Sequence, residues 1–541
     1  MSRRRQWRTL GAGLESLESR LPLTGNATGL LADAACVVVD QPVSASTDGT
    51  TAAQISLLTE VDDGIFFAAG PTVWKSDSAG ESVPIKGVPG TITSGTALDN
   101  NFLFTVNAGE GFSGTDQVEL WFSDGTADGT TKLRELGPWD FFGNNVQVDY
   151  LDVDGMQLLT VTQQLESDTV ASLWTSDGTV AGTAPYAEGF TGVLENAIHD
   201  LAELNGDYFF TSRRGIDSPL NLWKTDPVAK TVESIKSFNE PSVADFDTGI
   251  FSVATTVGDS LYFRANDGIS DYELWTSDGT EAGTRLVRDI NPNASSDPTI
   301  PGGSSATVLA DVNGTAYFLA NDGTGSGLWR TDGTTENTEK VSEVEGTVEG
   351  AVALGDTLYY ATGGNNTLWA ANATGNSMVT DLPGRPIRAT DEFETFIAVG
   401  ERFLFSLDDG QNGAELWISD GSVEGTALAV DANSAPGASS TPLHLTASDE
   451  QLLFLANDGD GIDIWSLDLQ SVGGTSNVVL PGDIDANGEV NFSDFLAFVT
   501  NFAKVDVTGG AADGDFDADG DVDFIDFLTL ARNFGKTLAD L

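Results

Sequence analysis

The chain has 541 residues, of which 40% are hydrophobic and 11 are tryptophan, a composition that indicates folded material. It carries 82 acidic residues against 25 lysines and arginines, which gives a formal net charge of −57. Such a surface repels phosphate groups, so we expect no binding to nucleic acid or to anionic lipid through a basic patch. The single cysteine, Cys36, excludes a disulfide within the chain, and no apolar stretch is long enough to span a membrane.

The first 25 residues look like a targeting segment. Four basic residues lie within residues 3–8, but the apolar run that follows, residues 10–14, is too short for a secretory signal. Residues 17–23 are similar to the LEPR-XLL motif at the N-terminus of large bacterial exported or surface proteins, with Ser19 and Pro22 departing from that motif. The resemblance implies an extracellular or cell-surface location. Residues 26–52 are expected to be a linker.

Nine tryptophans recur in one sequence context within residues 53–480. Neighbouring tryptophans lie 40 to 54 residues apart, and the shortest interval is the one between Trp329 and Trp369. The best copies, residues 119–130 and 273–284, share the string Glu-Leu-Trp-x-Ser-Asp-Gly-Thr. A period of this size indicates an architecture built from repeated supersecondary units. The nine residues are Trp74, Trp121, Trp174, Trp223, Trp275, Trp329, Trp369, Trp417 and Trp465.

Each repeat is expected to form four short strands. In the fifth repeat, the pattern predicts strands at 252–256, 260–265, 272–277 and 284–289, with Asn-Asp-Gly and Asp-Gly turns between them. Four strands in about 48 residues is the size of a β-propeller blade. The repeats resemble the ELW-type repeats of bacterial exported proteins, which implies a mainly β, β-propeller-like array of about nine four-stranded units. Since propellers usually have four to eight blades, an open array is an alternative to a closed ring.

The repeated tryptophan and aspartate admit two interpretations. In the first, the tryptophan packs between adjacent blades and the aspartate caps its own turn. In the second, both are presented as a ring for glycan or calcium binding. We favour the first, because the copies around Trp74, Trp223, Trp369 and Trp465 have lost much of the Asp-Gly-Thr string, so no role shared by all blades can depend on it.

Residues 481–541 contain two loops with the ligand spacing of an EF-hand. Such a loop has oxygen ligands at positions 1, 3, 5, 7, 9 and 12 and a glycine at position 6. The loops at 483–494 and 515–526 are offset by 32 residues and carry Gly488 and Gly520 at that position. They predict two calcium ions. The predicted ligands are Asp483, Asp485, Asn487, Glu489, Asn491, Asp494, Asp515, Asp517, Asp519, Asp521, Asp523 and Asp526, with position 7 of each loop acting through its backbone carbonyl.

A helix is expected after each calcium loop. Phe495, Phe498, Val499 and Phe502 fall at helical spacing, and the pattern recurs 32 residues later. Residues 481–482, Pro-Gly, leave no room for a helix before the first loop. With aspartate at position 12, the segment resembles a type I dockerin, which implies a small α-helical domain that folds around paired calcium loops and docks into a cohesin. Val490 and Val522, at position 8, are expected to pair the two loops.

The partner of this domain stays open at the level of the sequence. Dockerins commonly carry small hydroxyl residues at loop positions 10 and 11, where they read the cohesin. Here these positions hold Phe492-Ser493 and Phe524-Ile525. The alternatives are therefore a cohesin-like protein, a surface glycan, or docking of the exposed aromatic residues on the last blade of this chain.

Catalytic chemistry finds little support in the sequence. There are only two histidines, His199 and His444, in different repeats, which excludes a histidine-rich zinc site. We find no P-loop and no Gly-x-Ser-x-Gly element. We therefore favour an exported or cell-surface non-catalytic binding or scaffold protein with a calcium-dependent attachment module. The alternatives are a hydrolase or lyase that acts on polysaccharide from a propeller scaffold, since 82 acids can supply a carboxylate pair, and an intracellular scaffold.

Overall fold

The computed structural model describes residues 36–38 and 55–468, apart from 62–63, 78–81, 110–115, 140–144, 154, 165–168, 193–197, 213–218, 239–253, 293–302, 388–395, 424, 434, 436, 448–450 and 460–461. In the C-terminal part it describes residues 492–502 together with Ile484, Val490, Lys504, Val522, Leu530 and Phe534. The chain divides into two compact units. The first is Met1–Thr24 with Ala35–Asp468, and the second is Gly25–Ala34 with Leu469–Leu541.

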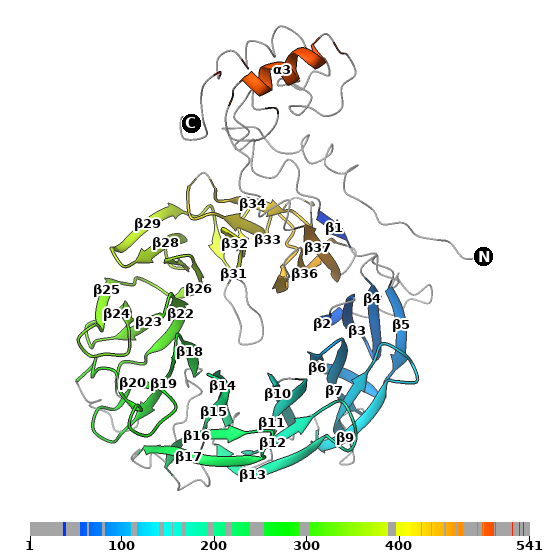
Figure 1. Ribbon diagram of the computed structural model, residues 1–541, viewed down its shortest axis with the longest axis vertical. Coiled ribbons are helices and arrows are strands. Elements are labelled where there is room, and N and C mark those ends of the chain that lie inside the picture. The colour runs from blue at the N-terminus through cyan, green and yellow to red at the C-terminus, as the bar shows by residue number, and fades with distance from the viewer. Residues whose placement is uncertain are drawn as a thin grey trace. The chain divides into compact units, whose positions relative to one another are not determined.

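The first unit is a β-propeller of nine antiparallel sheets that follow one another in chain order around a ring (Figure 1). Blade 1 consists of β2 (Ile55–Val61), β3 (Gly64–Ala69), β4 (Thr72–Asp77) and β5 (Ser82–Gly87). Blade 2 consists of β6 (Gly90–Leu98), β7 (Asn101–Ala108), β8 (Gln117–Ser123) and β9 (Thr131–Pro138). Blade 3 consists of β10 (Asn145–Val153), β11 (Met156–Gln164), β12 (Thr169–Ser176) and β13 (Ala184–Gly192). Blade 4 consists of β14 (Ile198–Leu204), β15 (Asp207–Ser212), β16 (Leu220–Asp226) and β17 (Thr231–Phe238). Blade 5 consists of β18 (Thr255–Val257), β19 (Ser260–Asn266), β20 (Tyr272–Ser277) and β21 (Arg285–Leu286). Blade 6 consists of β22 (Thr307–Val312), β23 (Thr315–Asn321), β24 (Ser326–Thr331) and β25 (Glu339–Glu343).

Blades 7 to 9 complete the ring. Blade 7 consists of β26 (Val348–Leu354), β27 (Thr357–Thr362), β28 (Thr367–Asn372) and β29 (Gly375–Asp381). Blade 8 has five strands, β30 (Arg385–Pro386), β31 (Phe396–Val399), β32 (Arg402–Asp408), β33 (Ala414–Ser419) and β34 (Ala427–Val430), because β30 and β31 both pair with β32. Blade 9 consists of β35 (Leu443–Ala447), β36 (Gln451–Asn457), β37 (Ile462–Asp468) and, from the N-terminal end of the chain, β1 (Cys36–Val38).

The ring is closed rather than open. Strand β1, which lies within the segment expected to be a linker, pairs with β37 through Val37 opposite Ser466 and so supplies the outer strand of the last blade. The first and last blades also share a core, in which Phe67 and Ala69 pack with Leu455 and Ile464. Closure therefore uses both backbone pairing and apolar packing.

Each repeated tryptophan lies on the third strand of its blade. In eight blades the residue directly opposite it on the second strand is Phe or Tyr, as in Phe104 opposite Trp121; Leu159 opposite Trp174 is the exception. In seven blades the register with the fourth strand slips immediately before the tryptophan, which is the signature of a β-bulge. The bulge leaves an additional residue on the fourth strand, such as Leu133 in blade 2.

The hydrophobic cores lie between blades. Trp121 of blade 2, for example, packs in one cluster with Phe66 and Val73 of blade 1. The ring of Phe66 stacks on that of Phe102 at 5.3 Å, and Phe102 stacks on Phe104 at 4.8 Å. Seven further tryptophans share a cluster with the preceding blade, namely Trp74, Trp174, Trp223, Trp275, Trp329, Trp369 and Trp417. The interpretation that the tryptophan packs between blades is confirmed for these positions.

The Asp-Gly-Thr turns are held together by their own side chains. In blade 2, the backbone N and the Oγ1 of Thr126 donate to Asp124 Oδ1 over 2.9 and 2.7 Å, and Ser123 Oγ pairs with Thr130 Oγ1 over 2.7 Å. The pKa of Asp124 is lowered, mainly by the hydrogen bond that its carboxylate accepts from the Thr126 side chain. The same turn recurs at Asp177, Asp278, Asp332 and Asp420. In these five turns the aspartate caps its own turn, as expected.

The second unit contains helix α3 (Phe492–Asn501), which begins within the last three residues of the first predicted calcium loop. Its buried residue, Phe498, packs with Val490, Val522 and Leu530, while Phe495 is half-buried against the same core. Of the apolar stripe that predicts this helix, Phe495 and Phe498 face the core, whereas Val499 and Phe502 do not. These two side chains are 54% and 47% exposed.

Candidate functional site

The predicted calcium ligands belong to the second unit. Asp494 lies in α3, and the other eleven predicted ligands lie outside the described residues. Within the predicted loops the structure describes Ile484, Val490, residues 492–494 and Val522, of which Val490 and Val522 are each at position 8. Both are fully buried, and they meet in one core with Phe498 and Leu530. Val490 and Val522 therefore meet in one core, and they are the residues that the sequence predicts to pair the two loops.

The chain after α3 is tied back to the second loop. The backbone N of Val522 donates to the carbonyl oxygen of Lys504 over 2.9 Å, and Lys504 Nζ donates to Asn501 Oδ1 over 2.5 Å. On its other side α3 exposes apolar side chains. Leu496 is 53% exposed, similar to Val499, and Phe502, which directly follows the helix, is exposed as well. The helix thus has one face in the core of its unit and one apolar face exposed.

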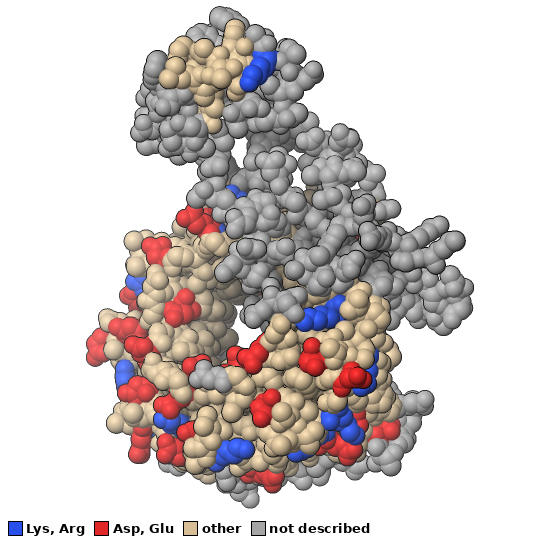
Figure 2. Space-filling view, turned by 45° about the vertical axis from the view of Figure 1, so that its right-hand side comes forward, with Lys and Arg blue, Asp and Glu red and all other residues tan. Residues whose placement is uncertain are grey.

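Charged groups on the propeller are dispersed. Figure 2 shows acidic and basic side chains interspersed over the visible face, without a basic patch. Lys132 and Lys340 are each shared between two carboxylates; Lys340 Nζ lies 3.0 Å from Asp322 Oδ2 and 2.6 Å from Glu343 Oε1. The hydrogen bonds from Thr324, followed by that from Lys340, lower the pKa of Asp322. On the visible face of the described propeller, basic side chains thus lie among acidic ones.

Three glutamates of the Glu-Leu-Trp string, Glu119, Glu273 and Glu415, are buried, and the last two hold backbone groups of the segment that follows their blade. Glu415 Oε1 accepts a hydrogen bond from the backbone N of Ser440 over 2.8 Å, and its Oε2 accepts one from the backbone N of Ala432 over 2.9 Å. Burial raises the pKa of Glu415 to about 7. Glu273 has the same role in blade 5, where it accepts from the backbone N of Asn291, and burial raises its pKa to about 7 as well. Each carboxyl thus accepts hydrogen bonds from the backbone of the segment that connects its blade to the next one.

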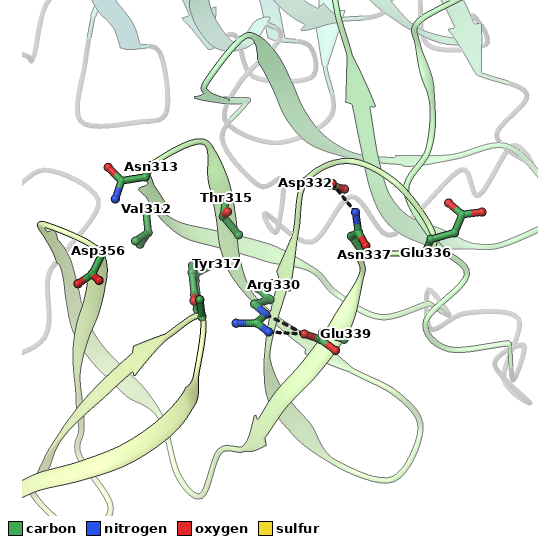
Figure 3. Close-up of a pocket in the computed structure, with 11 residues that line it drawn as sticks. Val312, Asn313, Thr315, Tyr317, Arg330, Asp332, Glu336, Asn337, Glu339 and Asp356 are labelled. Carbon is green, nitrogen blue, oxygen red and sulfur yellow. Dashed lines mark hydrogen bonds and ion pairs between the residues drawn. The ribbon is translucent and has the colours of Figure 1, made fainter.

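A pocket of about 410 Å³ lies between blades 6 and 7 (Figure 3). Arg330 and Glu339 stand side by side in it: Arg330 Nε donates to Glu339 Oε1 over 2.9 Å, and Nη1 donates to the carbonyl oxygen of Asn372 in blade 7 over 2.9 Å. Tyr317, the cross-strand neighbour of Arg330, accepts a hydrogen bond from its guanidinium. The remaining lining residues are Val312, Asn313, Thr315, Asp332, Glu336, Asn337, Asp356 and Ala373.

The lining of this pocket is mostly polar. Asp332 and Asn337 are engaged with each other, because Asn337 Nδ2 donates to Asp332 Oδ2 over 2.6 Å. Glu336 and Asp356 lie exposed at the rim on opposite sides of the blade boundary. One arginine faces four carboxylates, so the pocket is negative overall. No motif in the sequence marks these residues; the available signal was the short interval of 40 residues between Trp329 and Trp369.

Comparison with known proteins supports no family assignment. No family model matches the chain, and no curated protein matches its sequence. Among solved structures, the chain is similar to the tricorn protease at 11% identity and a TM-score of 0.25, covering 75% of this chain and 46%, less than half, of that one. Similarity to BamB from Moraxella catarrhalis reaches 12% identity and a TM-score of 0.33, over 65% of this chain and 91% of that one.

A third similar structure is the β-propeller domain of the Trilobed protease from Pyrococcus furiosus, at 12% identity and a TM-score of 0.30, over 61% of this chain and 98% of that one. Likeness at these identities says nothing of activity. In the described part of the chain, no helix is long and apolar enough to cross a membrane. The nine sheets, and the pairing of β1 with β37 that closes the ring, establish that the chain is a nine-bladed β-propeller protein.

Proposed function

We propose that the chain is an exported or cell-surface protein without catalytic activity, in which the propeller is a rigid binding scaffold and the C-terminal unit is a calcium-dependent attachment module. The observation that carries this proposal is the burial of Val490 and Val522 in one core with Phe498 and Leu530. A core this small seldom holds a domain together by itself, so calcium in the paired loops is expected to supply folding free energy.

The dockerin-like sequence of the module suggests a cohesin-like protein as its partner. The exposed side chains of Leu496, Val499 and Phe502 support docking onto a protein, because a helix with apolar side chains on its outer face gains free energy when a partner covers that face. A surface glycan would be expected to contact more polar groups. The propeller's repeated aspartates support a scaffold role, since five of them are engaged in their own turns.

The proposal is tested with the full chain in 1 mM calcium and in excess EGTA, against a panel of immobilised type I cohesins and against a cell-surface glycan array. We expect binding to a cohesin that is lost on chelation and weakened about tenfold or more by Val499→Ser, since a desolvated apolar contact is removed. Val228→Ser, an equally simple change at an exposed valine of the propeller (74% exposed), is the matched control. Calcium-independent attachment, or no calcium binding at all, would overturn the proposal.

A further inference from the structure

The pocket between blades 6 and 7 exists because one turn of the repeat is short. The connection between the third and fourth strands spans residues 124–130 in blade 2, 278–284 in blade 5 and 332–338 in blade 6. In blade 7 it is reduced to residues 373–374, where Asn372 pairs with Gly375 in a two-residue hairpin. Blade 7 therefore lacks the long turn that, in blades 2, 5 and 6, packs against the preceding blade.

The long turns fill the space over the preceding blade. A Cβ atom at Gly333, in the turn of blade 6, would lie 2.9 Å from the hydroxyl of Tyr262 in blade 5. A Cβ atom at Gly279, in the turn of blade 5, would lie 2.8 Å from Cζ of Phe209 in blade 4. Glycine is required there because these residues have positive φ and because the aromatic ring of the preceding blade touches the turn. The contact recurs between Gly421 and Tyr359.

Tyr317 and Arg330 occupy the corresponding positions in blade 6. Like Tyr262 and Thr276 in blade 5, they are cross-strand partners on the second and third strands. The turn that would cover them is the shortened one of blade 7, so the space in front of them forms the pocket, with Ala373 at its blade 7 side. Among the described turns between the third and fourth strands, that of blade 7 is the shortest, since even the short turn of blade 4 spans residues 227–230.

The chemistry of the lining restricts what fits. An anionic ligand is disfavoured, because Glu336, Glu339 and Asp356 outnumber the single Arg330. An apolar ligand would displace water from the exposed carboxylates of Glu336 and Asp356, which is costly. The adjacent Arg330 and Glu339 present a donor next to an acceptor, and each hydroxyl of a vicinal diol can both donate and accept. The volume, about 410 Å³, lies within the range of small-molecule pockets.

We propose that this pocket binds a neutral sugar residue, at the end of a glycan or within it. The proposal rests on the proposed function only in that an exported protein meets glycans. Arg330 donates to a ring or hydroxyl oxygen, Glu339 and Glu336 accept from hydroxyl groups, and Asp356 accepts from the blade 7 side. Because these acceptors come from two blades, the ligand bridges the blade boundary.

The test is ligand-observed NMR titration of the full chain with D-galactose, D-mannose, N-acetyl-D-glucosamine, D-glucosamine and D-glucuronic acid. We expect at least one of the neutral sugars to bind with a dissociation constant of about 1 mM and glucuronic acid to bind at least about tenfold more weakly. Ala373→Leu, which fills the pocket, should weaken binding about tenfold or more. Ala229→Leu in the short turn of blade 4 should not. Glu336→Gln should weaken binding several-fold, and Glu281→Gln in the turn of blade 5 should not.

Three results would overturn the assignment: no binding of any neutral sugar, tightest binding of glucuronic acid or of cationic glucosamine, or unchanged affinity in Ala373→Leu. Each titration is repeated in EGTA. Since the pocket lies within the propeller, sugar binding should persist there. If the proposed attachment module is wrong, calcium-dependent attachment to a cohesin is not seen, while the pocket still binds sugar. If the proposed sugar site is wrong, no sugar binds, while calcium-dependent attachment is still seen. The two proposals can therefore fail separately.

Discussion

Lys236 in blade 4 and Thr284 in blade 5 are joined by a hydrogen bond of 2.9 Å from the lysine Nζ to the threonine carbonyl oxygen. The same ammonium lies 5.5 Å from the ring centroid of Trp275 in blade 5. Equivalent bonds join Lys86 to Thr130 over 2.6 Å and Arg288 to Thr338 over 2.7 Å. In each case a basic side chain holds the end of the next blade's turn, so cations that are scarce in this chain stabilise the boundaries between blades.

We predict that Lys236→Met lowers the free energy of unfolding by about 1–2 kcal/mol, the size expected for a charge-assisted hydrogen bond with a cation–π contact at a partly exposed site. Urea unfolding followed by tryptophan fluorescence measures the change. Lys230→Met, at an exposed lysine in the β16–β17 turn, is the control and should stay within about 0.5 kcal/mol of the parent. Equal losses in the two variants would show that the inter-blade bond contributes nothing.

The buried Glu415 predicts a pH dependence of stability. Burial raises its pKa to about 7 from an ordinary value of 4.5, against the opposing hydrogen bonds from Ser440 and Ala432. Below pH 4.5 the carboxyl is protonated in both folded and unfolded chains and costs nothing. Between pH 4.5 and about 7 the unfolded chain ionises first, so this group destabilises the fold progressively, and above about pH 7 the cost is complete.

Replacement by Gln removes this titration. The stability difference between parent and Glu415→Gln should therefore shift by on the order of 2 kcal/mol between pH 4.5 and pH 7.5, in favour of the variant at the higher pH. Thermal and urea unfolding at four pH values measure it. Glu119→Gln is the control at the same position of the repeat in blade 2, where Lys132 Nζ lies 2.9 Å from the carboxylate. A pH-independent difference for Glu415→Gln would contradict the prediction.

Much of the propeller could be predicted from sequence because its strands are set by local alternation. Strand β20 has the expected bounds, 272–277. Strand β21 is shorter than expected, since it covers only Arg285–Leu286. Beyond it, the chain leaves the ladder and brings the backbone N of Asn291 to the buried carboxylate of Glu273. That contact spans 18 residues, and no local pattern reveals it.

The features that the sequence did not reveal depend on contacts between distant segments. The pairing of Val37 with Ser466 joins opposite ends of the propeller, and three residues are too few to show a strand period. In the second unit, the apolar spacing of α3 does not decide which residues are covered. Phe498 is buried because Val490, Val522 and Leu530 meet it, whereas Phe502 follows the end of the helix and is half exposed.

Ring closure by β1 predicts a specific role for the segment ahead of the first blade. Deletion of residues 1–38 leaves the last blade with three strands and exposes the backbone edge of β37. We therefore expect the melting temperature of the propeller to fall by several degrees. Deletion of residues 1–34 leaves β1 in place and should leave the propeller's melting temperature unchanged. Differential scanning calorimetry compares the two truncations. Equal melting temperatures would mean that apolar packing of Phe67 with Leu455 closes the ring without β1.

The two predicted calcium loops should differ in affinity. Apart from position 7, which binds through its backbone, the second loop has five side-chain carboxylates and the first has three. More negative charge attracts calcium more strongly, and it also raises the repulsion within the empty loop. We predict that the second loop binds more tightly. Isothermal titration calorimetry of Asp485→Ala, which leaves the second loop intact, should therefore give a tighter remaining site than Asp517→Ala, which leaves the first.

The shared core predicts that the loops are also coupled. Because Val490 and Val522 are fully buried together, calcium in one loop should order the other, and Val522→Ala should weaken binding in both loops although it removes no ligand. Val499→Ala, at an exposed position of α3, is the control and should leave both affinities within about twofold. Equal affinities in Asp485→Ala and Asp517→Ala would refute the charge argument. Loss confined to the second loop in Val522→Ala would refute the coupling and leave two independent sites.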